Sequence, residues 1–311
     1  MTLAILCSGQ GRQHAEMFAL TGNVPSATAI FTHASNLLGS DVREFAQGAS
    51  NEALHRNRAG QILCTTQALA AAAALEDAVA DRVIVAGYSV GEVAAWGVAG
   101  AITPSDTLDL VADRAEAMDS STASGDGLLF VRGLSRTTID LLCDRHGASI
   151  AIVNPGDAFV IGGNRMTLQS IAADAKALHA IGIVDLPVEV ASHTKQLIRA
   201  SAVFRQHLTR VSVTFPPRGD TRILSGIDGA SVLSLDAGLD KLAAQISQTV
   251  HWASCLQSCM EAGATAFLEL GPGRALSGMV AGAWNDMPSR ALDDFRSLQG
   301  VRDWLTRHVP S

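Results

Sequence analysis

A serine between two glycines is the feature of the sequence with the clearest chemical meaning. Ser89 is the third residue of Gly-Tyr-Ser-Val-Gly, residues 87–91, and this segment follows the apolar run Val83–Ala86. Between a strand and a helix, the pattern G-x-S-x-G is typical of a nucleophile elbow, whose sharp turn lifts the serine hydroxyl above the end of a sheet. The helix after the turn directs free backbone N–H groups towards an oxyanion on the acyl carbon. We therefore expect a nucleophilic serine; an ordinary turn serine is the alternative.

A nucleophilic serine needs a base, and His193 has the most suggestive position among the nine histidines. It follows the apolar segment Val184–Val190, where the chain is expected to leave an inserted subdomain and where a cleft should form. A capping or solvated histidine is the alternative, and sequence position alone leaves the choice open. Hydrolases with this elbow carry an acidic residue next and a histidine late in the chain. His193 lies before most of the C-terminal part, which argues against an ordinary esterase.

One arginine lies where it could serve the same cleft. Arg114 is 25 residues beyond Ser89, on the helix expected after the elbow helix. Arginine suits planar, bidentate recognition of a carboxylate. The residues alone nevertheless favour an exposed side chain paired with Asp113 or Glu116.

Motifs for cofactors and metals are incomplete. The segments Gly9–Gly11 and Gly271–Gly273 do not extend to G-x-G-x-x-G, because His14 and Leu276 occupy the last position. The sequence has no P-loop, no H-E-x-x-H and no paired C-x-x-C motif. We expect neither a cofactor nor a metal ion.

Alternating strands and helices must position these residues. Short apolar runs predict buried strands, and a long Ala- and Leu-rich run without Pro or Gly predicts a helix. The expected N-terminal elements are a strand at 3–7, a helix at 61–80, a strand at 83–86 and helices at 92–99 and 104–118. Beyond the middle of the chain, we expect a helix from His193 to about residue 208, strands at 222–224 and 266–269, and a helix at 236–247.

The middle of the chain has a pattern of its own. A Ser/Thr/Gly loop at 120–127 precedes a strand at 128–132, a helix at 135–145, strands at 149–153 and 158–161, a helix at 165–178 and a strand at 182–187. The order β-α-β-β-α-β is that of a ferredoxin-like arrangement. We therefore predict an α/β protein with a large domain at 1–125 and 188–311 and an inserted ferredoxin-like subdomain at 126–187.

Charge and hydropathy exclude several classes of function. Acidic residues outnumber basic ones by 30 to 23, so no basic excess is available for general nucleic-acid binding. With 48% hydrophobic and 17% charged residues, the chain should fold compactly. No run of 18 apolar residues is free of charge, Gly or Pro, and no basic export signal begins the chain, so we expect no membrane partner. The five scattered cysteines, including Cys255 and Cys259, fit buried thiols in a reduced, cytoplasmic protein.

Six segments together resemble the malonyl-CoA:acyl-carrier-protein transacylase family, in the family's order along nearly the whole chain. They are the loop Ser-Gly-Gln-Gly at 8–11, the elbow at 87–92, the helical segment at 113–118, Asn-Pro-Gly at 154–156, the segment 186–188 with Ser192 and His193, and Glu-Leu-Gly-Pro-Gly at 269–273. The resemblance implies an α/β-hydrolase-like large domain with a ferredoxin-like insert. Residues 86–100 and the tail at 293–302 are most similar to the acyltransferase (epsilon) subunit of bacterial malonate decarboxylase, which uses malonyl-CoA to prime that enzyme's own acyl-carrier subunit.

The resemblance also implies catalytic roles. Ser89 would form a malonyl ester, and His193 would act as general base and then as general acid. A backbone carbonyl at Gln245 would orient the histidine in place of an acidic residue. The backbone N–H groups of Gln10 and Val90 would form the oxyanion hole.

Two further residues complete the implied site. Arg114 would bind the malonyl carboxylate and select against acetyl groups, which would leave the arginine unpaired. Asn154 would support the site. Two positions depart from the family: Tyr88 replaces the usual histidine beside the nucleophile, and Ser8 replaces the loop proline.

We therefore expect an acyltransferase that moves malonyl from malonyl-CoA, through a seryl ester, to the thiol of an acyl-carrier protein and so primes malonate decarboxylase. The alternatives are a malonyl-CoA:acyl-carrier-protein transacylase of fatty-acid or polyketide synthesis, a thioesterase on the same elbow, and a non-catalytic scaffold subunit. Lys195, Arg199 and Arg210 would form a basic stripe on the helix expected from His193. The stripe could bind an acidic carrier; a solvated helix face is the alternative.

Overall fold

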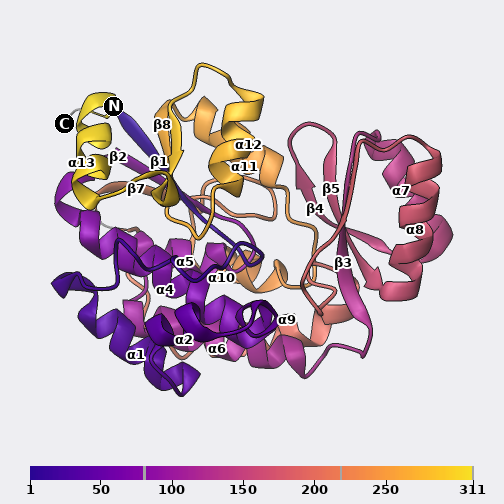
Figure 1. Cartoon of the computed structure of the whole chain (residues 1–311), viewed down its shortest axis with the longest axis horizontal. Helices are drawn as coiled ribbons and strands as arrows, with labels where there is room; N and C mark the ends of the chain where they lie inside the picture. The colour runs from indigo at the N-terminus through magenta and orange to yellow at the C-terminus, as the bar shows by residue number, and fades with distance from the viewer. Residues whose placement is uncertain (80–81, 218, 310–311) are drawn as a thin grey trace.

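The larger part of the computed structural model is built on a parallel sheet of five strands. The structure describes residues 1–79, 82–217 and 219–309. The strand order is β7-β2-β1-β8-β9 (Figure 1), with β1 at Thr2–Cys7, β2 at Arg82–Gly87, β7 at Asp220–Ile223, β8 at Ala264–Glu269 and β9 at Ser289–Ala291. Every residue of β1 is buried, as expected for a strand covered on both faces. The strands predicted at 3–7 and 83–86 thus correspond to β1 and β2, which pair with each other in this sheet.

Helices cover both faces of the large sheet. The helix α5 (Gly91–Val98) packs on β1 and β2, and α4 (Asn57–Leu75) packs on α5 and α6 (Pro104–Asp119). The helices α11 (Trp252–Glu261) and α12 (Ala275–Ala283) pack on β8, between the large sheet and the smaller lobe (Figure 1). The remaining helices of this lobe are α1 (Thr28–Leu38), α2 (Val42–Gly48), α3 (Asn51–His55), α9 (Ile198–Leu208), α10 (Leu235–Ala244) and α13 (Leu298–His308).

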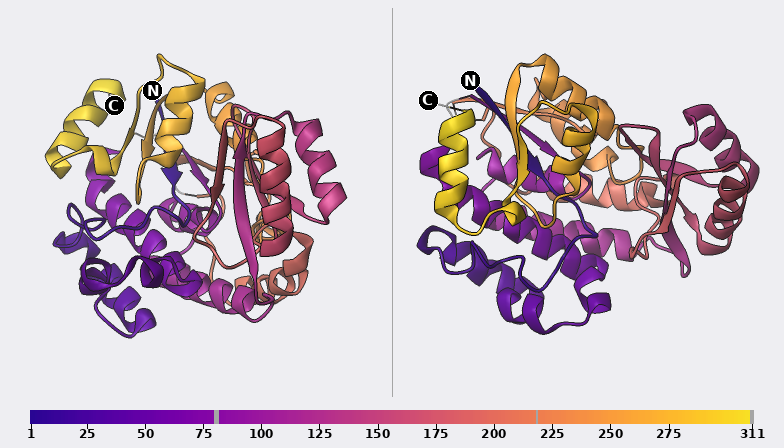
Figure 2. Two further views of the ribbon diagram at one scale, coloured as in Figure 1. Left: turned by 45° about the vertical axis from the view of Figure 1, so that its right-hand side comes forward. Right: turned by 45° about the horizontal axis from the view of Figure 1, so that its top comes forward.

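The smaller lobe is an antiparallel sheet with two helices on one face, and it projects to one side of the molecule (Figure 2). Its order along the chain is β3 (Asp126–Arg132), α7 (Arg136–His146), β4 (Ser149–Asn154), β5 (Ala158–Asn164), α8 (Arg165–Ala177) and β6 (Gly182–Asp185). The strands lie in the order β4-β5-β3-β6, with antiparallel pairs throughout. An apolar cluster of its own, including Val131, Ile139 and Ile171, holds the helices on the sheet. The predicted α/β class with a ferredoxin-like insert is confirmed; the domain limits at 126 and 187 stay a prediction.

The segment around His193 differs from the prediction. The helix expected from His193 begins only at Ile198, after a single 3-10 turn at Lys195–Leu197, because His193 has a left-handed backbone with φ 62°. The strand expected at 182–187 ends at Asp185. Since Lys195 precedes α9 and Arg210 follows it, the three residues of the basic stripe do not share one regular helix. Ala80, the last residue of the helix predicted at 61–80, lies outside the described residues.

All five cysteines are buried free thiols, as the sequence predicts for Cys255 and Cys259, which lie on α11. Within the three described ranges, no helix is long and apolar enough to cross a membrane.

Candidate active site

The candidate site lies where three neighbouring parallel strands end. Cys7 at the end of β1 pairs in register with Gly87 of β2, and Leu6 pairs with Glu269 of β8. Parallel strands have their carboxyl ends at the same edge of a sheet, which is where open α/β sheets bind ligands. The loop at 8–11 therefore lies beside the elbow that carries Ser89.

The elbow requires both of its glycines. Ser89 has a φ of 56°, the left-handed conformation of a strained turn. A Cβ atom on Gly87 would lie 2.1 Å from the backbone of Gly91, and one on Gly91 would lie 2.1 Å from the carbonyl oxygen of Cys7. No side chain fits at these distances, so the glycines let the strand, the helix and the neighbouring strand meet around the serine.

His193 is placed as a neutral base for Ser89. Its Nε2 lies 2.9 Å from the Ser89 hydroxyl, and its Nδ1 lies 2.5 Å from the carbonyl oxygen of Gln245. A carbonyl can only accept, so Nδ1 carries the proton and Nε2 is free to accept from the serine. Burial lowers the pKa of His193 to about 3, and the positive charge of Arg114 adds to this, while the Gln245 carbonyl opposes it. Sequence position alone could not decide between a base and a solvated histidine; this geometry favours the base.

Arg114 is fully buried on α6, so the expectation of an exposed ion pair with Asp113 or Glu116 is wrong. Its Nη1 donates to the side-chain oxygen of Gln61 at 2.8 Å, and its Nη2 donates to that of Gln245 at 3.1 Å. Its Nε has no hydrogen-bond partner among the described residues. Burial lowers the pKa of Arg114 to about 10, which still leaves the guanidinium charged at neutral pH.

Gln245 connects the arginine to the elbow. Its side-chain nitrogen donates to the backbone oxygen of Ser89 at 2.7 Å and to the carboxyl of Glu92 at 2.9 Å. Glu92 is buried at the start of α5, and burial raises its pKa to about 7. Sequence reasoning missed Glu92 and Gln61. Gln61 could have been noticed as a fully buried polar residue in an apolar helical run, whereas an acidic residue in a first helical turn is too common to signal a site.

Two backbone N–H groups, one in the loop after β1 and one in the elbow after β2, lack hydrogen-bond partners in the described part of the chain. They are the N–H groups of Gln10 and Val90. The loop that carries Gln10 is held against the elbow: a Cβ on Gly9 would lie 2.7 Å from the carbonyl oxygen of Tyr88, and the Cys64 thiol donates to the Gly9 carbonyl at 3.4 Å. Unpaired N–H groups at a turn and a helix start can stabilise a developing oxyanion.

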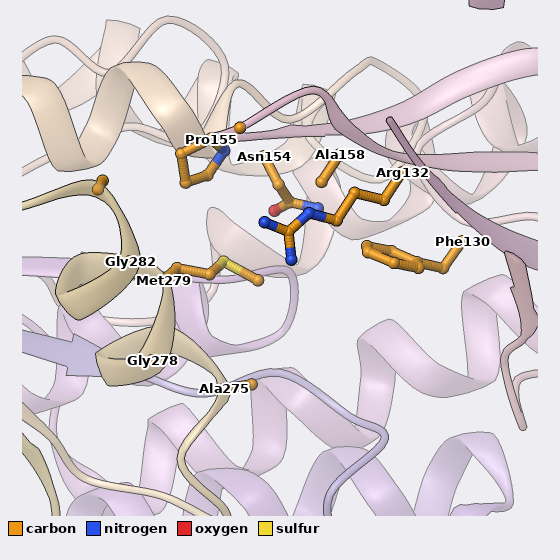
Figure 3. Close-up of a pocket in the computed structure, with 11 residues that line it drawn as sticks. Phe130, Arg132, Asn154, Pro155, Ala158, Ala275, Gly278, Met279 and Gly282 are labelled. Carbon is orange, nitrogen blue, oxygen red and sulfur yellow. The ribbon is translucent and has the colours of Figure 1, made fainter. Parts of the chain in front are cut away.

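Asn154 lies at the end of β4, near Tyr88 of the elbow. It is 4% exposed, yet neither amide atom makes a hydrogen bond of ordinary geometry with the described residues. It lines a cavity of about 270 Å³ between the small sheet and α12. Figure 3 shows Asn154 and Arg132 reaching into this space between Phe130 and Met279.

Tyr88, where the sequence departs from the resembling family, is an apolar packing residue. Its ring packs edge-to-face on Trp252 at 5.4 Å between centroids. Burial raises the pKa of Tyr88 to about 12, and the nearby Asn154 amide offsets part of that rise. The phenol is therefore neutral at physiological pH, beside the elbow and next to the cavity.

The fold, with a serine turn at the end of a parallel strand beside a histidine, is consistent with one class of protein: enzymes that transfer acyl groups. Residues 5–291 match the acyl transferase domain, and the chain belongs to that family. The family predicted from six short segments is thus confirmed, and the protein is an acyltransferase.

Named relatives resemble the chain over nearly its whole length. The malonyl CoA-acyl carrier protein transacylase of Mycobacterium bovis is 29% identical over 93% of this chain and 96% of its own, and the one of Synechocystis is 29% identical over 96% and 100%. The crystal structure of the acyl-carrier-protein S-malonyltransferase of Burkholderia pseudomallei has a TM-score of 0.89 at 28% identity and covers 97% of this chain and all of its own.

Proposed function

We propose that this protein is a malonyl-CoA:acyl-carrier-protein transacylase. The observation that carries the proposal is a charged, buried arginine joined through one glutamine to a serine–histidine pair: Arg114 to Gln245, and Gln245 to Ser89 and His193. The names of the relatives support the same donor and acceptor.

The first half-reaction transfers the acyl group to the serine. His193 accepts the proton of the Ser89 hydroxyl as the oxygen attacks the thioester carbonyl, and the N–H groups of Gln10 and Val90 bind the resulting oxyanion. The protonated Nε2 then gives its proton to the departing CoA sulfur, which leaves a malonyl ester on Ser89. In the second half-reaction the carrier thiol attacks this ester along the reverse path.

Arg114 supplies the preference for a dicarboxylic acyl group. A free carboxylate is costly to bury without a partner, and a guanidinium can offset that cost through two charge-assisted hydrogen bonds. The unpartnered Nε and the two neutral glutamine partners leave the arginine without a direct carboxylate partner in the described structure. An acetyl group has no carboxylate, so Arg114 would still lack a carboxylate partner after it binds.

The cavity at Asn154 is a suitable place for the amide-containing arm that carries the thioester. Its lining is apolar except for the Arg132 guanidinium and the unpartnered Asn154 amide. An amide in an apolar pocket favours a ligand with amide groups of its own.

The two candidate functions differ in the carrier protein that accepts the malonyl group. The relatives carry the general transacylase name, which favours carriers of fatty-acid or polyketide synthesis. Only the local similarity at 86–100 and 293–302 favours the carrier subunit of malonate decarboxylase. We therefore place the synthetic carriers first and malonate decarboxylase second. A thioesterase is less well supported, because Arg114 is available to the acyl group and His193 has a carbonyl rather than a carboxylate behind it.

Mass spectrometry of the intact protein tests the proposal. Incubation with malonyl-CoA should add one malonyl group to the wild-type chain and none to Ser89→Ala. Addition of a holo carrier should move the group to the carrier thiol, and the better of the two carriers identifies the acceptor. Full labelling of Ser89→Ala, or rapid release of free malonate without a carrier, would contradict the transacylase.

A further inference from the structure

A buried carboxylate ties the loop after β1 to the start of α12. Glu269, at the end of β8, is 0% exposed. Its Oε1 accepts from the hydroxyl of Ser8 at 2.8 Å, and its Oε2 accepts from the backbone N–H of Ser277 at 2.8 Å and from the Ser277 hydroxyl at 2.9 Å. Ser8 and Ser277 are each 4% exposed, so water does not compete for these hydrogen bonds.

These three residues make no hydrogen bond to Ser89, His193 or Arg114 in the described structure. Ser8 reaches the site through its backbone: its carbonyl oxygen would lie 2.9 Å from a Cβ on Gly91 of the elbow, and it is followed by Gly9, which also lies against the elbow, and then by Gln10. The loop has other contacts further on, because the Gln10 side chain donates to the backbone oxygen of Asn57 at 3.1 Å. Ser8 is the point where the loop leaves the sheet, and its side chain is fixed by an acceptor on the neighbouring strand.

The position of that loop matters for one atom in particular. Oxyanion donors act at 2.7–3.1 Å from the developing charge, and a misplacement of about 1 Å can lower a rate by as much as 100-fold. The N–H of Gln10 comes two residues after Ser8. The resembling family has a proline at Ser8, whose ring restricts the backbone by itself. A serine does not restrict the backbone in this way, so here the hydrogen bond to Glu269 would restrict the loop instead.

We propose that Ser8, Glu269 and Ser277, named here the Glu269 clamp, position the backbone N–H of Gln10 in the oxyanion hole. The proposal rests on the proposed function in so far as acyl transfer proceeds through Ser89. The clamp consists of positioning residues, not catalytic ones: Glu269 receives three hydrogen bonds from two segments, which leaves its carboxylate one orientation, and that orientation fixes where the loop begins.

The test compares Ser8→Ala with wild type in the full chain. The single-turnover rate of Ser89 acylation by malonyl-CoA should fall about 10-fold, while the KM changes less than about twofold, because the donor acts chiefly in the transition state. Ser8→Thr keeps the hydroxyl and should recover most of the rate. Ser277→Ala removes one of the three hydrogen bonds and should cause a smaller loss, about threefold.

Ser35→Ala is the matched control, because the partly buried Ser35 hydroxyl donates to the backbone oxygen of Phe31, accepts from the N–H of Val42 and makes no hydrogen bond to a clamp residue in the described structure. It should acylate at the wild-type rate. A lower melting temperature of Ser8→Ala with an unchanged acylation rate would make the clamp purely structural and overturn the proposal. A KM that rises as much as the rate falls would overturn it too.

A fluorophosphonate probe separates the clamp from the identity of the substrate. Its phosphoryl oxygen occupies the oxyanion hole when Ser89 is labelled, and no malonyl group is involved. If wild type labels but forms no malonyl ester, the proposed function fails, and slower labelling of Ser8→Ala still supports the clamp. If malonyl transfer is intact and Ser8→Ala labels at the wild-type rate, only the clamp fails.

Discussion

Gln245 is in contact with three of the residues proposed to act in catalysis. Its backbone oxygen holds the His193 imidazole, its side-chain nitrogen holds the elbow backbone and Glu92, and its side-chain oxygen holds Arg114. The backbone contact requires only a chain position, whereas the side-chain contacts require a glutamine. A group that both accepts and donates can bridge a cation and a carboxylate, which neither a carboxylate nor an aliphatic residue can do.

Replacement of Arg114 by alanine should change the choice of acyl group. The loss of about two charged hydrogen bonds should lower kcat/KM for malonyl-CoA roughly 100-fold, while transfer from acetyl-CoA should not fall. The ratio of the two kcat/KM values measures this. Arg58→Ala is a suitable control, since Arg58 donates to the backbone oxygens of Ala112 and Leu37 and should leave the ratio unchanged. An unchanged ratio in Arg114→Ala would refute the role in selectivity.

The lowered pKa of His193 predicts the pH dependence of Ser89 labelling. Only the neutral imidazole can accept a proton, and with a pKa of about 3 in place of the usual 6.5 it stays neutral as the pH falls. The rate of labelling by a fluorophosphonate should therefore show no inflection from His193 between about pH 5 and pH 8. An inflection near 7 is expected from Glu92 and should disappear in Glu92→Gln. An inflection near 6.5 that persists in Glu92→Gln would contradict the low pKa.

At the scale of elements, the shape of the elbow is limited by the close packing of β1, β2 and α5. The strand β2, the helix α5 and the strand β1 approach each other so closely that Gly91 has no room for a Cβ atom. This crowding holds Ser89 in its left-handed conformation, because the chain on both sides of it is fixed. Elements far apart in the sequence thus determine the geometry of one residue.

Gly91→Ala should destabilise the protein by about 3 kcal/mol or more, because its Cβ would lie 2.1 Å from a backbone oxygen of β1. Urea unfolding measures the change in the free energy of unfolding. Gly48→Ala is the matched control: Gly48 ends α2, a Cβ added there would have no heavy atom within 4 Å, and the substitution should be neutral or slightly stabilising. Equal stabilities of the two variants would contradict the close approach.

Much of the element order could be predicted from the sequence, and the exceptions have physical causes. The runs at β1 and β2 are apolar throughout because both faces are buried, and a long Ala-rich run without Gly or Pro has few alternatives to a helix. The prediction of a helix from His193 was wrong, because this residue accepts a hydrogen bond from Ser89, donates one to the Gln245 backbone and has a left-handed backbone that interrupts the helix. Such contacts over 50 or more residues leave no local pattern.

The site residues also differed in whether a local sequence pattern could identify them. Ser89 stands in a local motif and can be found from it, and Arg114 could be named only through a resemblance, because a buried arginine and an exposed one look alike in sequence. The burial of Arg114 depends on α4 and α10, which supply Gln61 and the neighbouring Gln245. The Glu269 clamp joins residues 261 positions apart, so no spacing rule could have identified it.

At the scale of the whole molecule, two lobes with separate apolar clusters enclose a cavity between them. Phe130, Arg132 and Asn154 come from the small lobe, and Met279 comes from α12 of the large one. Each lobe has its own apolar core, and the cavity lies between the two.

Met279→Trp should fill part of this cavity. The KM for malonyl-CoA should rise about 10-fold, while labelling of Ser89 by a small fluorophosphonate should stay at the wild-type rate, because we propose that the cavity binds the arm of the donor and not the reacting atoms. Met166→Trp on the exposed surface of α8 is the control and should change neither quantity. An unchanged KM in Met279→Trp would exclude the cavity from donor binding.

The central place of β1 in the large sheet has a consequence for the synthesis of the protein. This strand is made before both of its neighbours, β2, which starts at Arg82, and β8, which starts at Ala264. Strand pairs between segments so far apart form slowly, because the entropy cost of closing a long loop comes before any stabilising contact is made. The loop that carries Gln10 can therefore meet Glu269 only after β8 has been synthesised, and a nascent chain that ends before β8 contains Ser89 but lacks the proposed Glu269 clamp.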